Sequence, residues 1–128
     1  MTVASSRRLI QAMTAVVVFL LVLHCKLYWD YGRLKIQVAF ASEQIAIFDA
    51  MRSAALQSDL AGAAGKLQYV VWYYPSGSKQ QTGSRLDQIV ERERTNAVKQ
   101  ILTYLKTKTG EDLGNDPQKW IEKYAKDK

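Results

Sequence analysis

Side chains that could do chemistry are few in this sequence. Its 128 residues include one histidine and one cysteine, His24 and Cys25, which are neighbours at the end of an apolar run. A single cysteine excludes an intramolecular disulfide and a cysteine-rich zinc site, and a single histidine excludes a metal site built on a His pair. We interpret His24 and Cys25 as side chains at a membrane boundary, with no metal or redox role.

A run of alternating charge, Glu91-Arg92-Glu93-Arg94, is the second candidate. Catalytic carboxylates need convergent geometry in a dry pocket, and nothing around this run predicts one. We interpret the run as a solvated helix face with ion pairs three or four residues apart. The sequence also has no Gly-rich phosphate loop, no metal-ligand spacing and no nucleophile beside a base. It therefore predicts neither an enzyme nor a bound cofactor or metal.

The apolar run Leu9–Cys25 is the strongest signal in the chain. Its 17 residues include no Asp, Glu, Lys or Arg. As a helix it would span about 26 Å, close to the ~30 Å hydrocarbon core of a bilayer. We predict a transmembrane anchor over residues 9–25, or to 31 with its aromatic flank, after an N-terminal tail at 1–8. The residues predicted to lie at the membrane interface are Arg7, Arg8, Lys26, Tyr28, Trp29 and Tyr31.

A cleaved signal peptide is the alternative, because a basic start and an apolar run fit both. However, the first A-x-A triplet, at 39–41, begins 14 residues past Cys25. Lipidation of Cys25 is a third reading, although His24 is not the small residue that such processing needs before the cysteine.

Basic residues flank the run on both sides, and the pair nearest to it is N-terminal. We expect a single-pass protein whose C-terminal portion is periplasmic or otherwise extracytoplasmic.

The positive charge of the chain is concentrated near this run. The net charge is +6, from 18 basic and 12 acidic side chains, and residues 1–35 carry five of the basic and one of the acidic ones. The expected partner of this charge is anionic lipid. No basic stripe with stacking aromatics elsewhere indicates nucleic-acid binding.

Residues 33–74 are expected to form one long helix. They contain no proline, and apolar residues recur at three- and four-residue steps, with a slip in phase near residue 55. The part nearest the membrane should lie beyond the reach of the next helix, which would leave its apolar stripe without an internal partner. We therefore expect an interface through residues 36–54. Its candidate residues are Ile36, Phe40, Ile47 and Met51.

Two features of this predicted helix leave alternatives open. Residues 61–65, Ala-Gly-Ala-Ala-Gly, form a small-residue patch that includes Gly62 and Gly65, although glycine costs a helix about 1 kcal/mol relative to alanine. We interpret the patch as a helix crossing, and the alternative is a ligand pocket opened by the missing side chains. Residues 69–74 are aromatic or β-branched and suit a strand by propensity. Without a visible partner strand, we expect them to be the buried last turns of the helix.

A second helix is predicted over residues 84–109. Pro75 ends the first helix, Ser84 is placed as the N-cap, and Gly110 stands where a left-handed residue closes a helix. The two helices should pair as an antiparallel hairpin over residues 33–109. The inward face of the second helix is predicted to comprise Leu86, Ile89, Val90, Ala97, Val98, Ile101, Leu102 and Leu105.

A short capping helix is predicted within residues 110–128. Asp116 is its expected N-cap, Pro117 occupies the first turn, and Trp120 lies on its apolar face. Residues 109–120 resemble the T-G-x-D-(F/L)-G-x-D-P-x-x-W tail of bacterial HEAT-repeat-type helical proteins. Residues 94–105 resemble the second helix of such a repeat. The resemblance implies a hairpin repeat unit closed by a Trp-bearing cap, but no second repeat is detectable and a solenoid needs three or more.

These patterns predict an all-α chain: one N-terminal transmembrane helix, a long antiparallel helical hairpin and a short C-terminal capping helix. The expected function is that of a membrane-anchored protein-interaction or scaffold module. The alternative is a membrane-surface sensor or ligand-binding helical domain. Besides lipid, the expected partner is a second copy or a helical protein, docked through residues 36–54, and not a small molecule. The alternative for that stripe is a helix lying flat on the bilayer.

Overall fold

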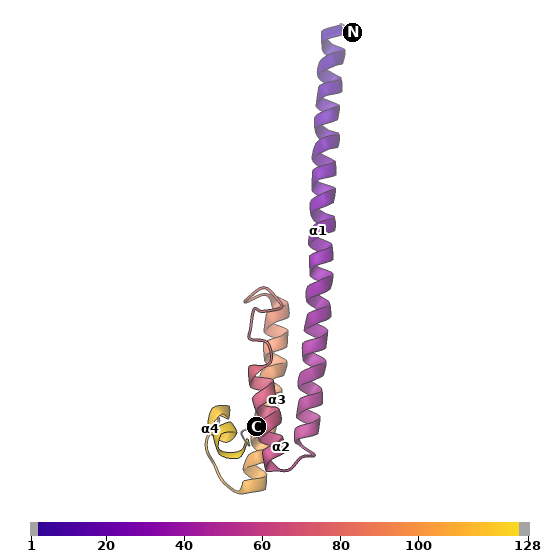
Figure 1. Ribbon diagram of the computed structural model, residues 1–128. Helices are drawn as coiled ribbons and strands as arrows, with labels where there is room; N and C mark the ends of the chain where they lie inside the picture. The colour runs from indigo at the N-terminus through magenta and orange to yellow at the C-terminus, as the bar shows by residue number, and fades with distance from the viewer. Residues whose placement is uncertain (1–2, 126–128) are drawn as a thin grey trace. The chain divides into compact units, whose positions relative to one another are not determined.

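The computed structural model describes residues 3–125 and contains four helices and no strand in that range. They are α1 (Val3–Ala55), α2 (Leu60–Trp72), α3 (Arg85–Thr109) and α4 (Pro117–Tyr124) (Figure 1). The all-α prediction is confirmed, and the strand alternative for residues 69–74 is wrong. The ends of two predicted segments, 1–2 of the tail and 126–128 of the cap, lie outside the described residues. The chain divides into two compact units, Met1–Ile36 and Gln37–Lys128.

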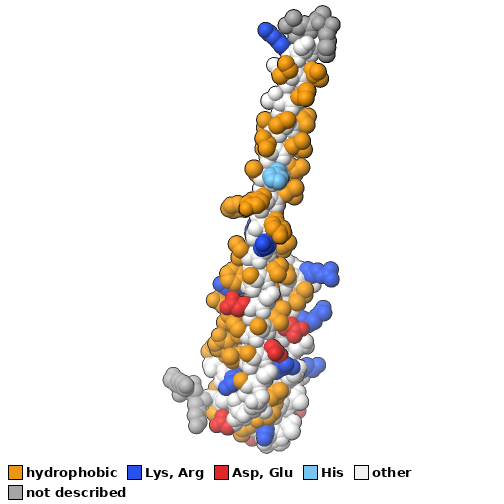
Figure 2. Space-filling view, turned by 90° about the vertical axis from the view of Figure 1, so that its right-hand side faces the viewer, with side chains coloured by type: hydrophobic (Ala, Val, Ile, Leu, Met, Phe, Trp, Pro, Cys, Tyr) orange, Lys and Arg blue, Asp and Glu red, His pale blue; other side chains and the backbone are white. Residues whose placement is uncertain are grey.

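The first unit consists of the N-terminal part of α1. Within the described residues, α1 contains a stretch that is long and apolar enough to cross a membrane, with a mean hydropathy of 2.0 and none of its residues buried. Figure 2 shows hydrophobic side chains covering this segment. The helix continues through Gly32. The six residues predicted at the membrane interface, Arg7, Arg8, Lys26, Tyr28, Trp29 and Tyr31, are all exposed.

The expected continuous helix over residues 33–74 is wrong, because α1 ends at Ala55 and α2 begins at Leu60. In the turn that follows α1, the Ser58 hydroxyl donates to the Ala54 carbonyl at 2.7 Å. The Asp59 carboxylate then accepts from the Gly62 N–H at 2.8 Å and caps α2. The phase slip near residue 55 marks this break.

The second unit packs the end of α1, together with α2, α3 and α4, around one core. Small residues let α2 approach its neighbours, since Ala63 and Ala64 are fully buried. The glycines of the patch do not mark the crossing. A Cβ at Gly65 would meet nothing within 4 Å, and one at Gly62 would meet the Asp59 carboxylate of its own cap. The largest fully buried side chains are Trp120, Phe48, Leu67, Ile101, Leu105, Val70 and Val90.

The end of α1 has an internal partner, contrary to the expectation for residues 36–54. The Gln80 amide donates to the Gln44 side chain at 2.7 Å, and both residues are buried. Arg52 donates to the Gln100 side chain at 3.0 Å. The second helix and its preceding loop therefore reach back along α1. Of the four candidate interface residues, Phe40, Ile47 and Met51 are partly buried and only Ile36 is exposed.

Local capping sets the bounds of α3 and α4. The Ser84 hydroxyl accepts from the Asp87 N–H at 3.2 Å, and Gly110 closes α3 in the left-handed region with φ 68°. The Asp116 carboxylate accepts from the Gln118 N–H at 3.0 Å. The indole N–H of Trp120 donates to the Gly114 carbonyl at 3.1 Å, so the buried ring keeps its polar group bonded.

Candidate functional site: an aromatic groove at the end of α2

The residues first considered for chemistry do not converge on a reactive site. His24 and Cys25 both lie exposed on α1. Across residues 3–125, no three His, Cys, Asp or Glu side chains gather closely enough to hold a metal ion. The helical face Glu91–Arg94 is also not uniformly solvated, because the Arg94 side chain is only 11% exposed.

Arg94 caps the C-terminal end of α2. Its guanidinium donates to the carbonyls of Val70 at 2.7 Å and Tyr73 at 2.8 Å, and also to the carbonyl of Tyr74. The same group lies 4.7 Å from the centre of the Phe48 ring. The last carbonyls of a helix have no partner within it and carry partial negative charge, so a buried cation here satisfies and stabilises them. The solvated-face interpretation is wrong for this residue.

Asp87 closes the loop between α2 and α3. This buried carboxylate accepts from the Ser76 hydroxyl at 2.9 Å and from the backbone N–H groups of Gly77 and Gly83 at 3.0 and 2.9 Å. Burial of the carboxylate works to raise its pKa. The hydrogen bonds and the charge of Arg94 outweigh that effect, so the Asp87 pKa is lower than usual. Asp87 and Arg94 together hold the loop and the helix end that shape the groove described next.

A groove of about 730 Å³ follows one face of α2 and continues onto the loop. The helical spacing of Gly65, Gln68, Tyr69 and Trp72 places them on this face. Large aromatic side chains are exposed along it, with Tyr69 at 45%, Trp72 at 59% and Tyr74 at 41%. The expectation of a buried end is therefore wrong for Tyr69, Trp72 and Tyr74, whereas Val70 is fully buried and Val71 and Tyr73 pack against the core. The lining residues are Gly65, Gln68, Tyr69, Trp72, Tyr73, Tyr74 and Pro75.

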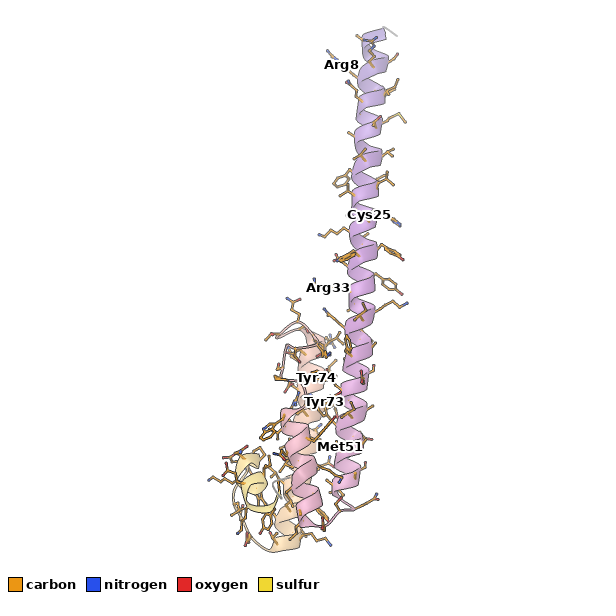
Figure 3. The ribbon with its side chains drawn as sticks, viewed as in Figure 1. Arg8, Cys25, Arg33, Met51, Tyr73 and Tyr74 are labelled. Atoms are coloured by element: carbon orange, nitrogen blue, oxygen red, sulfur yellow. The ribbon has the colours of Figure 1, made fainter. Side chains whose placement is uncertain are left out.

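The aromatic wall of the groove is fixed by ring contacts with its neighbours. Tyr69 stacks on Tyr73 with centroids 5.1 Å apart, and Tyr74 meets Tyr73 edge-on at 4.6 Å. Figure 3 labels Tyr73 and Tyr74 near the end of α2. Tyr73 also packs edge-on against the buried Phe48 at 6.2 Å. The Lys79 ammonium lies 4.4 Å from the centre of the Tyr74 ring. These contacts make the wall a preorganised surface.

Tyr74 carries backbone strain at this surface. Its φ of 41° is in the left-handed region, and it is the one non-glycine residue in residues 3–125 with a positive φ. A bulky residue pays about 1–3 kcal/mol for such a conformation, and the following Pro75 restricts it further. The Arg94 bonds to the carbonyls of Tyr73 and Tyr74 hold this geometry. Strain retained at an exposed aromatic residue is typical of a binding site.

The polar groups of the groove are available for a ligand. Elsewhere in the second unit, Tyr104 donates to the Ser58 carbonyl at 2.6 Å and Tyr124 donates to Glu111 at 2.7 Å. Five polar groups of the groove donate no side-chain hydrogen bond within residues 3–125. They are the hydroxyls of Tyr69, Tyr73 and Tyr74, the Trp72 indole N–H and the Gln68 amide. Burial and then the negative charge of Glu43 raise the Tyr73 pKa above its ordinary value.

Sequence reasoning found the residues of this surface but not its role. The aromatic run was visible, yet its exposure depends on how α2 ends. Open space at Gly65 agrees with the pocket alternative for the glycine patch. The likeness of residues 109–120 to HEAT-repeat-type proteins stays a prediction. No protein-family model, curated protein or solved structure matches this chain.

Proposed function

We propose that this chain is a membrane-anchored helical interaction module. Residues 9–25 form the anchor, and the second unit carries the docking surface for a protein partner. The proposal is supported by the exposed apolar stretch of α1 and by the absence of a metal-ligand cluster among the described residues. Two arginines before the anchor support an extracytoplasmic C-terminal portion.

The observation that carries the proposal is the exposed aromatic groove. Within the described residues, every buried side-chain nitrogen and oxygen has a hydrogen-bond partner. The second unit thus satisfies its own core and still leaves Tyr69, Trp72 and Tyr74 exposed side by side. Tyrosine and tryptophan dominate the energetic centres of protein interfaces because they combine a large apolar face with a polar tip.

Site-specific photocrosslinking in native membranes tests the proposal. A benzophenone amino acid replaces Trp72 in the full-length chain, and a control chain carries it at the exposed Arg92 on α3. We expect discrete crosslinked protein adducts from position 72 and none, or different ones, from position 92. Identical adducts from both positions, or adducts to lipid alone from position 72, would show that the groove docks no protein.

We also propose self-association of the chain through exposed residues of α1. Ile36, one of the four candidate interface residues, is 59% exposed. Membrane anchoring would place copies in parallel, and Ile36→Cys in a Cys25→Ser background tests this pairing. We expect disulfide-linked dimers in membranes, and fewer from Met51→Cys, because Met51 is partly buried. If Ile36→Cys stays monomeric under oxidation and only lipid shields it from thiol reagents, the helix lies on the bilayer instead.

A ligand-binding function is the second candidate, and the volume of the groove favours it. A hollow of about 730 Å³ with open space at Gly65 is within the range of small-molecule sites. Mass spectrometry of the protein released from membranes under mild conditions would detect a retained small molecule. Loss of that molecule in Trp72→Ala would assign it to the groove.

A further inference from the structure

The outer face of α3 carries a line of positive charge. Arg85, Arg92 and Lys99 are exposed and recur at every seventh residue, which places them on one side of the helix, about 10.5 Å apart along its axis. We call these three residues the basic ridge. Within residues 3–125, none of them joins an ion pair. The next residue in the series, Lys106, is partly buried and pairs with Asp112 at 3.0 Å, so it is not counted in the ridge.

The acidic residues of α3 have other contacts. Asp87 is buried and holds the loop before α3. Glu91 pairs with Arg94 at 3.2 Å, and Glu93 lines a small hollow that Arg52 of α1 also lines. The ridge is thus a row of cations that no ion pair within the described chain neutralises. The side chains between its members are uncharged on the same side of the helix: Gln88, Ile89, Thr95 and Asn96.

A hollow of about 380 Å³ adjoins the C-terminal end of the ridge. Its charged lining residues are Lys99 and Lys106, and its apolar ones are Val98 and Leu102. Leu102 is buried, and Val98 packs against the core while remaining partly exposed. A partner can therefore place an apolar side chain here while its carboxylates meet the ridge.

The spacing of the ridge distinguishes between anionic partners. A strand of duplex DNA carries a phosphate about every 3.4 Å, so the ridge would meet only about one phosphate in three. Recruitment to lipid headgroups uses clusters of about 4–8 basic residues or a helix face rich in large apolar side chains, and the ridge has three cations beside Ile89. An α-helix with a carboxylate at every seventh residue has the same ~10.5 Å repeat. A second copy of this face would instead bring like charges together.

We propose that the basic ridge docks an acidic helix of a protein partner, with carboxylates at seven-residue spacing. No ridge residue lines the aromatic groove, so this second docking surface goes beyond the proposed function. Charge complementarity at a fixed spacing sets the register of the partner, although each exposed ion pair contributes little. The affinity for a single helix should therefore be weak and should fall as salt is added.

Peptide binding to the full-length protein in nanodiscs of zwitterionic lipid, at low ionic strength, tests the inference. The probe is a fluorescein-labelled, stapled helical peptide as long as α3, with a glutamate at every seventh residue, followed by fluorescence anisotropy. A stapled peptide of the same composition with its glutamates clustered is the control. We expect saturable binding of the spaced peptide, at least about threefold tighter than that of the clustered peptide.

Two triple variants lose the same charge from different places. Replacing the ridge, by Arg85→Gln with Arg92→Gln and Lys99→Gln, should weaken binding of the spaced peptide at least about fivefold. The control variant should change binding less than about twofold. It replaces three exposed lysines outside the ridge: Lys35→Gln, Lys108→Gln and Lys119→Gln. All six positions are exposed, so both variants should keep the far-UV circular dichroism of the wild type.

Three peptide results would overturn the inference. They are no saturable binding of the spaced peptide, equal binding of the spaced and clustered peptides, and equal weakening by the two triple variants. A benzophenone amino acid in place of the exposed Asn96, between Arg92 and Lys99, identifies what meets the ridge in native membranes. Adducts to a protein segment with acidic residues seven apart support the inference, and adducts to lipid or nucleic acid alone, to any other segment, or none overturn it. Position 72 reports on the aromatic groove, so failure of the groove and failure of the ridge are read separately.

Discussion

Arg94 is the residue on which the end of α2 depends most. A lysine could place a charge there, but it lacks the planar fork that reaches several carbonyls at once. We expect Arg94→Lys to lower the free energy of unfolding by about 1.5–3 kcal/mol, because charge-assisted bonds to Val70, Tyr73 and Tyr74 are lost. Urea unfolding in micelles followed by far-UV circular dichroism measures this.

The neighbouring Arg92 provides a matched control for that substitution. It lies exposed on the same helix. Arg92→Lys should change stability by less than about 0.5 kcal/mol, as expected for an exposed surface site. Equal effects of the two substitutions would contradict the capping role of Arg94.

Asp87 should make stability depend on pH in the acid range. Its folded pKa is lowered, so its contribution is complete above the unfolded value of about 3.9 and is lost as the pH falls through the folded pKa. We expect Asp87→Asn to be less stable than the wild type at pH 7 and to show a flatter decline of stability below about pH 4. Asp116→Asn, which preserves an N-cap, is the control. Parallel pH curves for wild type and Asp87→Asn would contradict this.

These two residues show why some roles could not be predicted from the sequence. The capping roles of Ser84 and Gly110 could be predicted because a cap involves residues within one turn. Arg94 donates hydrogen bonds to carbonyls that lie 20 to 24 residues away in the sequence. Which carbonyls need a partner depends on where α2 ends, and tertiary packing decides that.

At the scale of elements, the two glycines of α2 should respond oppositely to alanine. Gly65 has open space at its Cβ position, so Gly65→Ala should stabilise the chain by about 0.5–1 kcal/mol through helix propensity. At Gly62 a Cβ would lie 2.8 Å from the Asp59 carboxylate, so Gly62→Ala should disturb the cap and destabilise the chain. Thermal unfolding by circular dichroism distinguishes the two. Equal stabilisation by both would mean that Asp59 does not cap α2.

The capping helix α4 can be tested through its tryptophan. Trp120 is fully buried, and its indole N–H donates a hydrogen bond to the Gly114 carbonyl. Trp120→Ala should therefore lower the free energy of unfolding by about 3–5 kcal/mol. Trp72→Ala serves as the matched control, since Trp72 is 59% exposed and should cost less than about 1 kcal/mol. Chemical unfolding of both variants gives the comparison. A loss under about 1 kcal/mol for Trp120→Ala would mean that α4 does not pack on the core.

The helices themselves were mostly predictable, and the break between α1 and α2 shows the limit. Apolar periodicity identified both segments, and the slip near residue 55 marked their junction. The polar pair Ser58-Asp59 is a start signal for α2 that the prediction passed over. A 13-residue helix such as α2 is marginal by itself, and its packing against α3 and α4 makes a separate helix stable.

For the whole molecule, the apolar stretch of α1 is a candidate membrane span. Side chains from Leu9 to Leu23 are exposed on the helix, and no other part of the described chain covers them. Each large apolar side chain left in water forgoes about 1.5–3 kcal/mol. A bilayer around the stretch would remove this cost.

Alkaline carbonate extraction of native membranes tests this central claim most directly. The full-length wild-type protein should stay in the membrane pellet and dissolve only in mild detergent. A variant carrying Val17→Lys and Leu20→Lys should be released, because a charge at the centre of a spanning helix costs about 2.5–3.5 kcal/mol. Full-length wild-type protein in the carbonate supernatant, or a mature form that lacks residues 9–25, would contradict the membrane anchor.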